Sequence, residues 1–162
     1  MDSARQLGYT PRPPYAVGRL GIEDGLDIAT WQSPGPWAVQ DALQPPRPDE
    51  GYWAVRDAEG ALIGFCCFGE AARVPGQQGS AKILDVALGL RPDLTGRGLS
   101  RDFARTVVEQ ARRIAEGRTL RCVVANWNEL GRKTAESVGF KLAGIHSVTG
   151  GARVSSYFVY SM

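Results

Sequence analysis

The amino-acid sequence predicts a single α/β domain built on one mixed sheet of about seven strands, with about four helices packed beside it. Short apolar, β-rich runs separated by turn residues recur along most of the chain, as strands do. Amphipathic segments follow residues 98 and 128, as expected for helices that cover a sheet. The chain has 162 residues, 43% of them hydrophobic, enough to bury one core without disulfides or metal ions. We expect residues 1–14 to form a tail or lead-in strand and residues 15–162 to form the domain.

The beginning of this domain predicts short elements. A strand is expected at residues 15–20. Asp24 is expected to cap a helix whose apolar positions follow the helical period only loosely. The prolines and glycine of residues 33–36 end that helix. A second short helix at residues 37–43 then runs into a stiff, proline-rich loop.

A β-hairpin is predicted next. Residues 52–56 and 61–68 are β-rich runs joined by the Asp- and Gly-containing residues 57–60. The second run has no polar alternation, which predicts a central strand covered on both faces. Residues 70–80 predict a loop or a distorted strand end, and residues 83–90 predict another buried strand.

The residues after Gly98 predict a long helix. Apolar residues recur three or four positions apart along it, namely Leu99, Phe103, Val107, Ala111 and Ile114. Charges of both signs interleave on the other side, which indicates a solvated helix face rather than a nucleic-acid surface. Gly117 is expected to end the helix in the left-handed conformation.

The last part of the chain predicts a strand at residues 119–125 and a helix at residues 129–138. Residues 140–146 and 154–160 are expected to form a final antiparallel pair of strands, linked by a turn at residues 149–152.

Composition excludes several classes of protein. The net charge of +2 is too small to indicate nucleic acid as a partner. No apolar run approaches the roughly 18 residues that span a bilayer, and the N-terminus lacks the apolar core of a signal peptide, so we expect no membrane partner and a cytoplasmic location. Cys66, Cys67 and Cys122 lie in apolar strands without a zinc-like spacing, which predicts buried, reduced thiols and no metal site.

The stretch from Leu84 to Phe103 reads as a strand, a glycine-bearing turn and a helix start. Such a turn leaves main-chain N–H groups without partners, at the positive end of the helix dipole. An anion, above all a phosphate, would satisfy both. The turn lacks the Gly-Lys-Ser/Thr of a P-loop and the third glycine of a dinucleotide fold, and a plain strand-to-helix turn is the alternative.

Residues 88–100, the following strand, and residues 128–140 together resemble the GNAT superfamily of acyl-CoA-dependent N-acyltransferases, and are most similar to bacterial ribosomal-protein N-terminal acetyltransferases. The resemblance covers residues 50–162 well. It implies a mixed, mostly antiparallel central sheet and transfer of an acetyl group from acetyl-CoA to a primary amine of a small molecule or a peptide N-terminus. The alternative is an acyl-CoA-binding or regulatory module of the same fold without turnover.

The family signature Gln/Arg-x-x-Gly-x-Gly/Ala falls on residues 95–100 and departs from it at both ends. Thr95 replaces a long hydrogen-bond donor, and Ser100 replaces a glycine or alanine. The resemblance implies main-chain contacts to the thioester and pantetheine arm, N–H contacts to the pyrophosphate, and one asparagine beside the pantetheine. The residues implied are Leu88 and Leu90, then Thr95, Gly96, Arg97, Gly98, Leu99, Ser100 and Arg101, and finally Asn128.

Asp85 is the candidate general base. It is the one carboxylate in an otherwise apolar strand, and it matches an acidic position in many relatives of the family. The alternative is a hydrogen-bonded, structural aspartate. Many relatives carry a tyrosine acid at the position of Ala135, so the sequence names no general acid.

The acceptor is expected to be an amine, and a homodimer stays an open alternative. Four aromatic residues, Trp31, Trp37, Tyr52 and Trp53, belong to the half of the chain that binds the acceptor in relatives. They are expected either to line a pocket or to pack in the core. Tyr157, Tyr160 and His146 are expected to be structural.

Overall fold

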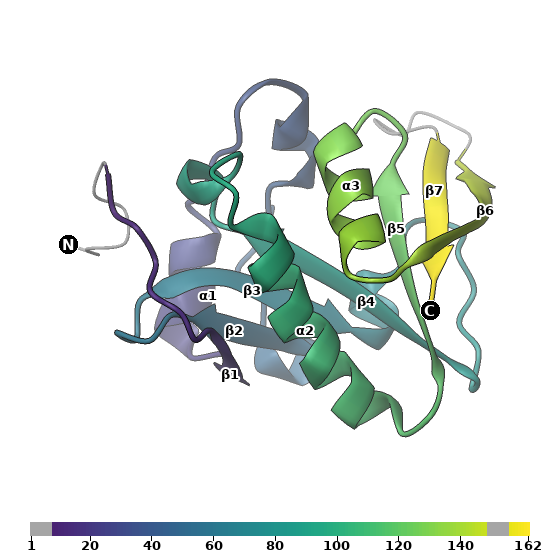
Figure 1. Cartoon of the computed structure of the whole chain (residues 1–162), viewed down its shortest axis with the longest axis horizontal. Coiled ribbons are helices and arrows are strands. Elements are labelled where there is room, and N and C mark those ends of the chain that lie inside the picture. Colours follow the sequence, from purple (N-terminus) through teal and green to yellow (C-terminus); the bar gives the residue numbers. More distant parts are fainter. Residues whose placement is uncertain (1–7, 149–155) are drawn as a thin grey trace.

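The computed structural model describes residues 8–148 and 156–162, and within them seven strands form one sheet in the order β1-β2-β3-β4-β5-β7-β6 (Figure 1). Neighbouring strands run antiparallel except β4 and β5, which are parallel. The predicted mixed, mostly antiparallel sheet is therefore confirmed. The strands are β1 (Ala16–Arg19), β2 (Tyr52–Arg56), β3 (Leu62–Phe68), β4 (Ile83–Leu90), β5 (Thr119–Ala125), β6 (Lys141–Ser147) and β7 (Ser156–Ser161).

Helices lie on both faces of this sheet. In Figure 1, α2 and α3 lie in front of the strands and α1 lies behind them. Of the four predicted helices, three are α-helical, and the second is a 3-10 helix, η2, because Pro34 and Pro36 restrict its start. The helices are α1 (Ile22–Ile28), α2 (Ser100–Ala115) and α3 (Glu129–Ser137), and the 3-10 helices are η2 (Gly35–Gln40), η3 (Pro48–Glu50), η4 (Gly69–Ala72) and η5 (Pro92–Leu94).

Three local predictions differ from the structure or fall outside it. Asp24 was expected at the N-cap of α1, but Gly21 holds that place, and the Asp24 carboxylate reaches back to accept the Gly21 N–H at 2.8 Å. The left-handed stop of α2 begins at Glu116, with φ of 49°, one residue before the predicted Gly117. The predicted turn at residues 149–152 lies outside the described residues.

Two apolar cores fill the space between the sheet and the helices on its two faces. The larger one lies between the sheet and α2 with α3, and the predicted stripe of α2 supplies Phe103, Val107 and Ala111, all fully buried. The smaller one lies under α1 and contains Leu20, Ile28 and Trp31. Strand β3 contributes to both cores, which confirms its predicted central position.

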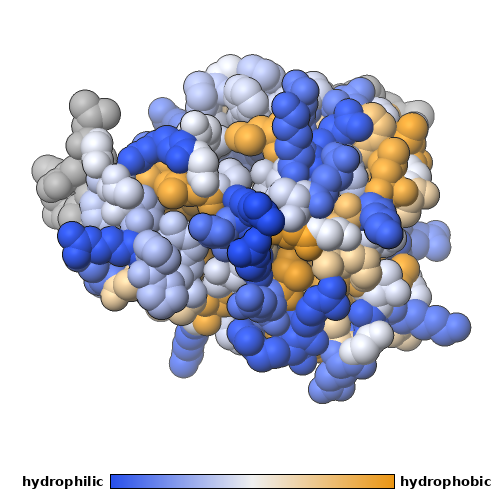
Figure 2. Space-filling view, viewed as in Figure 1, coloured by the Kyte–Doolittle hydropathy of each residue, from blue (hydrophilic) through white to orange (hydrophobic). Residues whose placement is uncertain are grey.

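A glycine in β3 allows α2 to pack close to the sheet. A Cβ on Gly64 of β3 would collide with the ring of Phe103, so glycine at this position allows the helix to pack directly on the strand. Hydrophilic side chains cover much of the face that carries α2 and α3, as the interleaved charges predict (Figure 2). None of the described helices has the length and apolar composition that crossing a membrane requires.

Candidate functional site

The sheet opens between β4 and β5. These strands pair only at their beginnings, where Ile83–Asp85 lie opposite Thr119–Arg121. Beyond Asp85, the described part of β4 pairs with β3 alone, and the described part of β5 beyond Arg121 pairs with β7 alone. We call the gap that follows the last pair, Asp85 and Arg121, the opening.

The main chain of β4 faces this opening at the predicted positions. The Arg91 N–H donates to the Ile63 C=O at 2.8 Å, so this residue pair is a hydrogen-bonded pair of the β3–β4 ladder. Hydrogen-bonded and non-bonded pairs alternate along an antiparallel ladder. The N–H and C=O groups of Leu88 and Leu90 therefore point away from β3 and towards β5, where the described strands offer them no ladder partner.

The opposite edge of the opening belongs to β5. Leu120 and Met162 exchange two hydrogen bonds, at 2.9 and 3.0 Å, so the main-chain groups of Val123 and Ala125 point away from β7 and towards β4. One of these main-chain groups, the Ala125 C=O, already accepts a hydrogen bond from the Asn128 N–H at 2.9 Å. An extended ligand lying in the opening would find main-chain donors and acceptors on both sides.

The opening leads to the predicted anion site at the start of α2. We call residues Thr95–Leu99 the glycine turn. Gly96 and Gly98 have φ of 77° and 80°, in the left-handed region, and open space surrounds the position of a Cβ on either residue. The turn therefore needs glycine for its conformation and leaves its main chain accessible to a ligand.

The first turn of α2 supplies free donors. Leu99, the N-cap residue, has no side chain that could cap the helix. The first helical hydrogen bond runs from the Phe103 N–H to the Leu99 C=O, at 3.1 Å. The N–H groups of Ser100, Arg101 and Asp102 have no acceptor within the described part of the chain. These groups and the helix dipole form a cradle for an anion.

The side chains around this cradle differ in whether they already form hydrogen bonds. Thr95 and Arg101 are exposed, so both can reach a bound ligand. The Arg97 guanidinium, predicted to contact phosphate, donates instead to the Tyr9 C=O at 2.8 Å and to the Thr10 hydroxyl at 3.2 Å.

Asn128 lies at the far end of the opening and caps α3. Its Oδ1 accepts the Gly131 N–H at 2.9 Å and the Trp37 indole N–H at 3.4 Å. A Cβ on Gly131 would lie 2.7 Å from the Asn128 side-chain nitrogen, which explains the glycine inside this helix. Trp37 also packs edge-on against Trp127, with ring centroids 5.9 Å apart. The η2 segment therefore reaches the start of α3.

The four aromatic residues that were expected either to line an acceptor pocket or to pack in the core differ in their positions. Trp31 and Tyr52 pack in the smaller core and Trp53 packs against the larger one, while Trp37 alone reaches Asn128.

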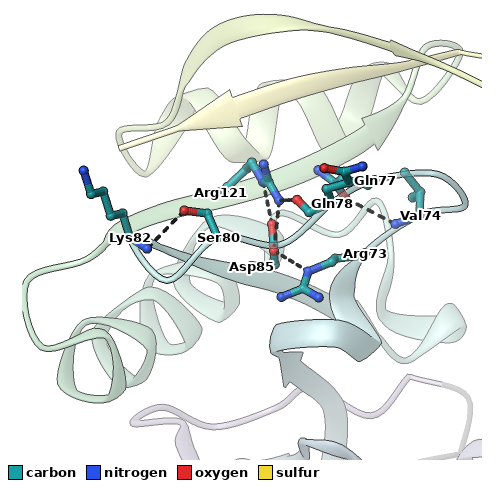
Figure 3. Close-up of polar contacts among 8 residues, drawn as sticks. All are labelled: Arg73, Val74, Gln77, Gln78, Ser80, Lys82, Asp85 and Arg121. Atoms are coloured by element: carbon teal, nitrogen blue, oxygen red, sulfur yellow. Dashed lines mark hydrogen bonds and ion pairs between the residues drawn. The ribbon is translucent and has the colours of Figure 1, made fainter.

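Asp85 is bound by two arginines at the point where the strands part (Figure 3). Arg73 Nε donates to Asp85 Oδ2 at 2.8 Å, and Arg121 donates to both carboxylate oxygens at 2.6 and 3.0 Å. Arg121 also donates to the Gln78 C=O at 2.8 Å, which ties the loop at residues 73–80 to the sheet. Only 2% of the Asp85 side chain is exposed, so this geometry favours the structural alternative over the general base.

The other residues considered in the sequence analysis are Tyr160, His146, Tyr157 and Ala135, and the first two form hydrogen bonds within the protein. Tyr160 is buried, and its hydroxyl donates to Glu136 at 3.4 Å. His146 Nε2 lies 2.8 Å from the Pro75 C=O, and burial raises the pKa of Tyr157. Ala135 is buried in the larger core. In the described residues, no three His, Cys, Asp or Glu side chains gather as metal ligands would.

Sequence reasoning missed three arginines around the site. Arg73 and Arg121 hold Asp85, and the signal for Arg121 was a charge inside an apolar strand, as for Asp85 itself. Arg91 is 1% exposed and binds Asp93 at 2.6 Å, and its signal was the Arg-Pro-Asp sequence that ends β4.

An opened sheet followed by an anion cradle at a helix start suits an extended ligand ending in phosphate, the kind of ligand that acyl-CoA-dependent acyltransferases bind. A family model described as an acetyltransferase (GNAT) domain matches residues 27–141, so the chain belongs to the GNAT acetyltransferase family, whose acyl donor is acetyl-CoA. A comparison with curated protein sequences found no match. The family implies a donor site, and the opening and the cradle are the candidate for it.

Solved structures share this fold at low sequence identity. A GNAT-family acetyltransferase from Bacillus anthracis superimposes with a TM-score of 0.71 at 10% identity, covering 93% of this chain and 95% of the other. A spermidine N-acetyltransferase SpeG chimera from Vibrio cholerae and hSSAT gives 0.69 at 15% identity, covering 91% and 94%. AAC(6')-Ib in complex with ribostamycin and coenzyme A gives 0.68 at 15% identity, covering 91% and 93%.

Proposed function

We propose that this acetyltransferase moves the acetyl group of acetyl-CoA to a primary amine of a small molecule or a peptide N-terminus. The single observation that carries the proposal is that β4, whose unpaired edge lines the opening, leads through η5 and the glycine turn into the cradle at the start of α2. Together they offer main-chain groups for an extended arm and N–H groups for its phosphates.

The proposed donor contacts follow from which groups lack partners. Leu88 and Leu90 would pair with the pantetheine arm as a neighbouring strand would. The main-chain N–H groups from Gly96 to Arg101 would hold the pyrophosphate, with Thr95 and Leu99 shaping the turn. The side chain of Asn128 lies where it can border the arm. These residues fit the donor because the cradle is open and its N–H groups have no acceptor among the described residues.

The chain also supplies part of the chemistry. When bound, the donor presents a thioester carbon that an amine attacks, and the C–S bond breaks as the C–N bond forms. The free N–H groups of β4 can polarise the thioester carbonyl. The amine must lose a proton and the departing thiolate must gain one. The Asp85 carboxylate stays the predicted proton acceptor, although the N–H groups of Arg73 and Arg121 already occupy its oxygens.

Two neighbours support an amine as the acceptor class. One is a spermidine N-acetyltransferase, and the other is bound to ribostamycin with coenzyme A. Each acceptor compound carries primary amines. A panel of polyamines, aminoglycosides and short peptides with free N-termini would therefore test the acceptor proposal.

The donor site is tested by two matched glycine variants. Gly98 and Gly117 both have left-handed φ, of 80° and 88°, and open space around a Cβ. Alanine therefore costs about 1–2 kcal/mol of backbone strain at either position. We expect only Gly98→Ala to weaken coenzyme A binding, by about tenfold or more, because only its Cβ occupies the cradle. Equal dissociation constants for the two variants, measured by calorimetry, would remove the cradle from the donor site.

A second candidate is a donor-binding protein without turnover. Ala135 stands where many relatives have an acid, and Asp85 is occupied by arginines, and both observations favour this candidate. Release of free coenzyme A thiol across the amine panel separates the two functions. Thiol release that depends on the amine supports the enzyme, whereas donor binding without release for any amine supports the binding protein.

A further inference from the structure

The N-terminal segment, residues 9–12, crosses from the β2–β3 turn to the glycine turn and contacts both. Residues in these two turns lie far apart in the sequence, yet polar contacts of this one segment join them. The donor site proposed above contains the glycine turn but none of the residues of the N-terminal segment.

One end of the segment is anchored at Asp57, which is 5% exposed. The Tyr9 hydroxyl donates to Asp57 Oδ2 at 2.5 Å, and the Arg12 N–H donates to the same oxygen at 3.1 Å. The Ala58 N–H donates in turn to the Arg12 C=O at 2.7 Å. The hydrogen bond to Asp57 is the main reason that the pKa of Tyr9 rises to about 12, so this hydroxyl stays a donor at neutral pH.

Asp57 itself is fixed by the hairpin. Its other oxygen, Oδ1, accepts the N–H groups of Glu59 and Ala61 at 3.1 and 3.0 Å. Burial opposes the charge on Asp57, but the hydrogen bonds from Tyr9, Arg12, Ala61 and Glu59 outweigh it and lower the pKa of Asp57. The anchor is therefore rigid and charged.

The other end of the segment holds Arg97. This arginine stands between the two left-handed glycines and is the only side chain of Thr95–Leu99 for which the described residues provide a hydrogen bond. Its acceptors, the Tyr9 carbonyl and the Thr10 hydroxyl, are both neutral. Among the described residues, no carboxylate lies within ion-pair distance of this guanidinium to offset its charge.

We infer that residues 9–12 act as a positioning element for the phosphates of the donor, fixing the glycine turn and the charge of Arg97 before the donor arrives. A turn with two flexible glycines loses conformational entropy when it closes on a ligand, and an external anchor reduces that loss. The inference rests on the proposed donor site. It gives the segment a role in phosphate binding without direct contact to the phosphates.

The test is coenzyme A binding by a variant that combines Tyr9→Phe with Thr10→Val. These changes remove one hydrogen bond at each end of the segment and keep both side chains at similar size. We expect the dissociation constant for coenzyme A to rise about five- to tenfold. Binding of pantetheine, which lacks the phosphates, and kcat at saturating donor should not change.

The matched control combines Tyr15→Phe with Thr106→Val. Thr106 donates only to the Asp102 C=O on the exposed side of α2, and the control removes the same chemical groups outside the segment. It should bind coenzyme A as the unaltered protein does. Thr10→Val alone, which removes one of the two acceptors of Arg97, should raise the dissociation constant about two- to threefold.

Arg97→Ala separates action through Arg97 from a general effect on folding. In an Arg97→Ala background, the changes at Tyr9 and Thr10 should add little, since the segment has lost its contact with the turn. Unaltered coenzyme A binding by the segment variant would overturn the inference, and so would an equal loss of pantetheine. Failure of the unaltered protein to bind coenzyme A would instead overturn the proposed function.

Discussion

At the scale of single residues, the main feature of the site is a buried carboxylate, Asp85, that forms ion pairs with two arginines. Asp85 lies between Arg73 and Arg121 at the last paired position of β4 and β5, with 27% and 16% of the arginine side chains exposed. A buried carboxylate with two cationic partners is fixed in place, and each partner comes from a different segment. The cluster therefore positions the loop at residues 73–80 beside the opening.

Replacing Asp85 by asparagine should lower the free energy of unfolding by about 3 kcal/mol, near the low end for broken buried ion pairs because both arginines keep some contact with water. Urea denaturation measures this change. The matched control is Asp49→Asn, since Asp49 pairs with Arg47 at the surface, and it should change stability by less than about 1 kcal/mol. A stable variant that binds donor but has lost turnover would instead support Asp85 as the general base.

The three free cysteines should not react with thiol reagents in the native protein. Cys66 and Cys67 are buried as predicted, and Cys122 is partly buried. This burial raises the pKa of the Cys67 and Cys122 thiols to about 12 and raises that of Cys66 as well. A raised pKa favours the neutral thiol, so at pH 8 only about one thiol in ten thousand is the reactive thiolate. Ellman's reagent should detect three thiols at once in urea but none within minutes in the native protein. A fast native reaction would contradict this burial.

At the scale of elements, α3 begins with a side chain that needs a glycine. Alanine in place of a helical glycine ordinarily stabilises a protein by about 1 kcal/mol. At Gly131 the added Cβ would lie 2.7 Å from the Asn128 side-chain nitrogen and 3.0 Å from Val124. The N-cap of α3 and the contact with Trp37 therefore depend on Gly131.

Gly131→Ala should lower the free energy of unfolding by about 1 kcal/mol, because loss of the cap and the steric overlap exceed the gain in helix propensity. Thermal denaturation measures this, and a change in tryptophan fluorescence should accompany it as Asn128 moves from Trp37. Ser137→Ala, on the exposed side of the same helix, is the control and should change stability by less than about 0.5 kcal/mol. An increase in stability would show that the cap is dispensable.

The elements themselves were predictable from the sequence because their signals are local. Apolar runs placed β4 and β5 at their observed limits, and the apolar stripe of α2 placed its buried face. Asp24 was misassigned because a carboxylate can cap a helix from its third position as well as from the N-cap.

The side-chain contacts of the site could not be predicted in the same way. The contact of Arg97 with Tyr9 joins residues 88 positions apart in the sequence. The parting of β4 and β5 depends on which strand each one pairs with, and a sequence pattern does not encode that choice. Family resemblance pointed to the candidate residues of a donor site, but the fold is needed to show which of their groups lack a partner within the described residues.

At the scale of the whole molecule, the sheet consists of two halves joined at a short seam. Strands β1 to β4 form one half and β5, β7 and β6 form the other, and in the described sheet three residue pairs of β4 and β5 join their ladders. The second half ends in β6, where Leu142 and Ile145 are 53% and 65% exposed. Apolar atoms reach the surface on this side of the molecule (Figure 2).

Amide hydrogen exchange should therefore resolve the two halves. Without donor, the amides of β5, β7 and β6 should open at a lower free energy than those of β2, β3 and β4, since the seam gives the second half few shared hydrogen bonds. Saturating coenzyme A should raise protection in both halves and bring their opening energies closer. One common opening energy without donor would contradict this description.

If the donor binds in the opening as proposed, the short seam should link donor supply to the lifetime of the protein. A ligand lying in the opening would act as an additional strand and splint the two halves together, so that they unfold as one cooperative unit. Proteases cleave the transiently opened states of a protein, and a donor that suppresses local opening slows its degradation. We expect a protein short of acetyl-CoA to be degraded faster as well as to work more slowly.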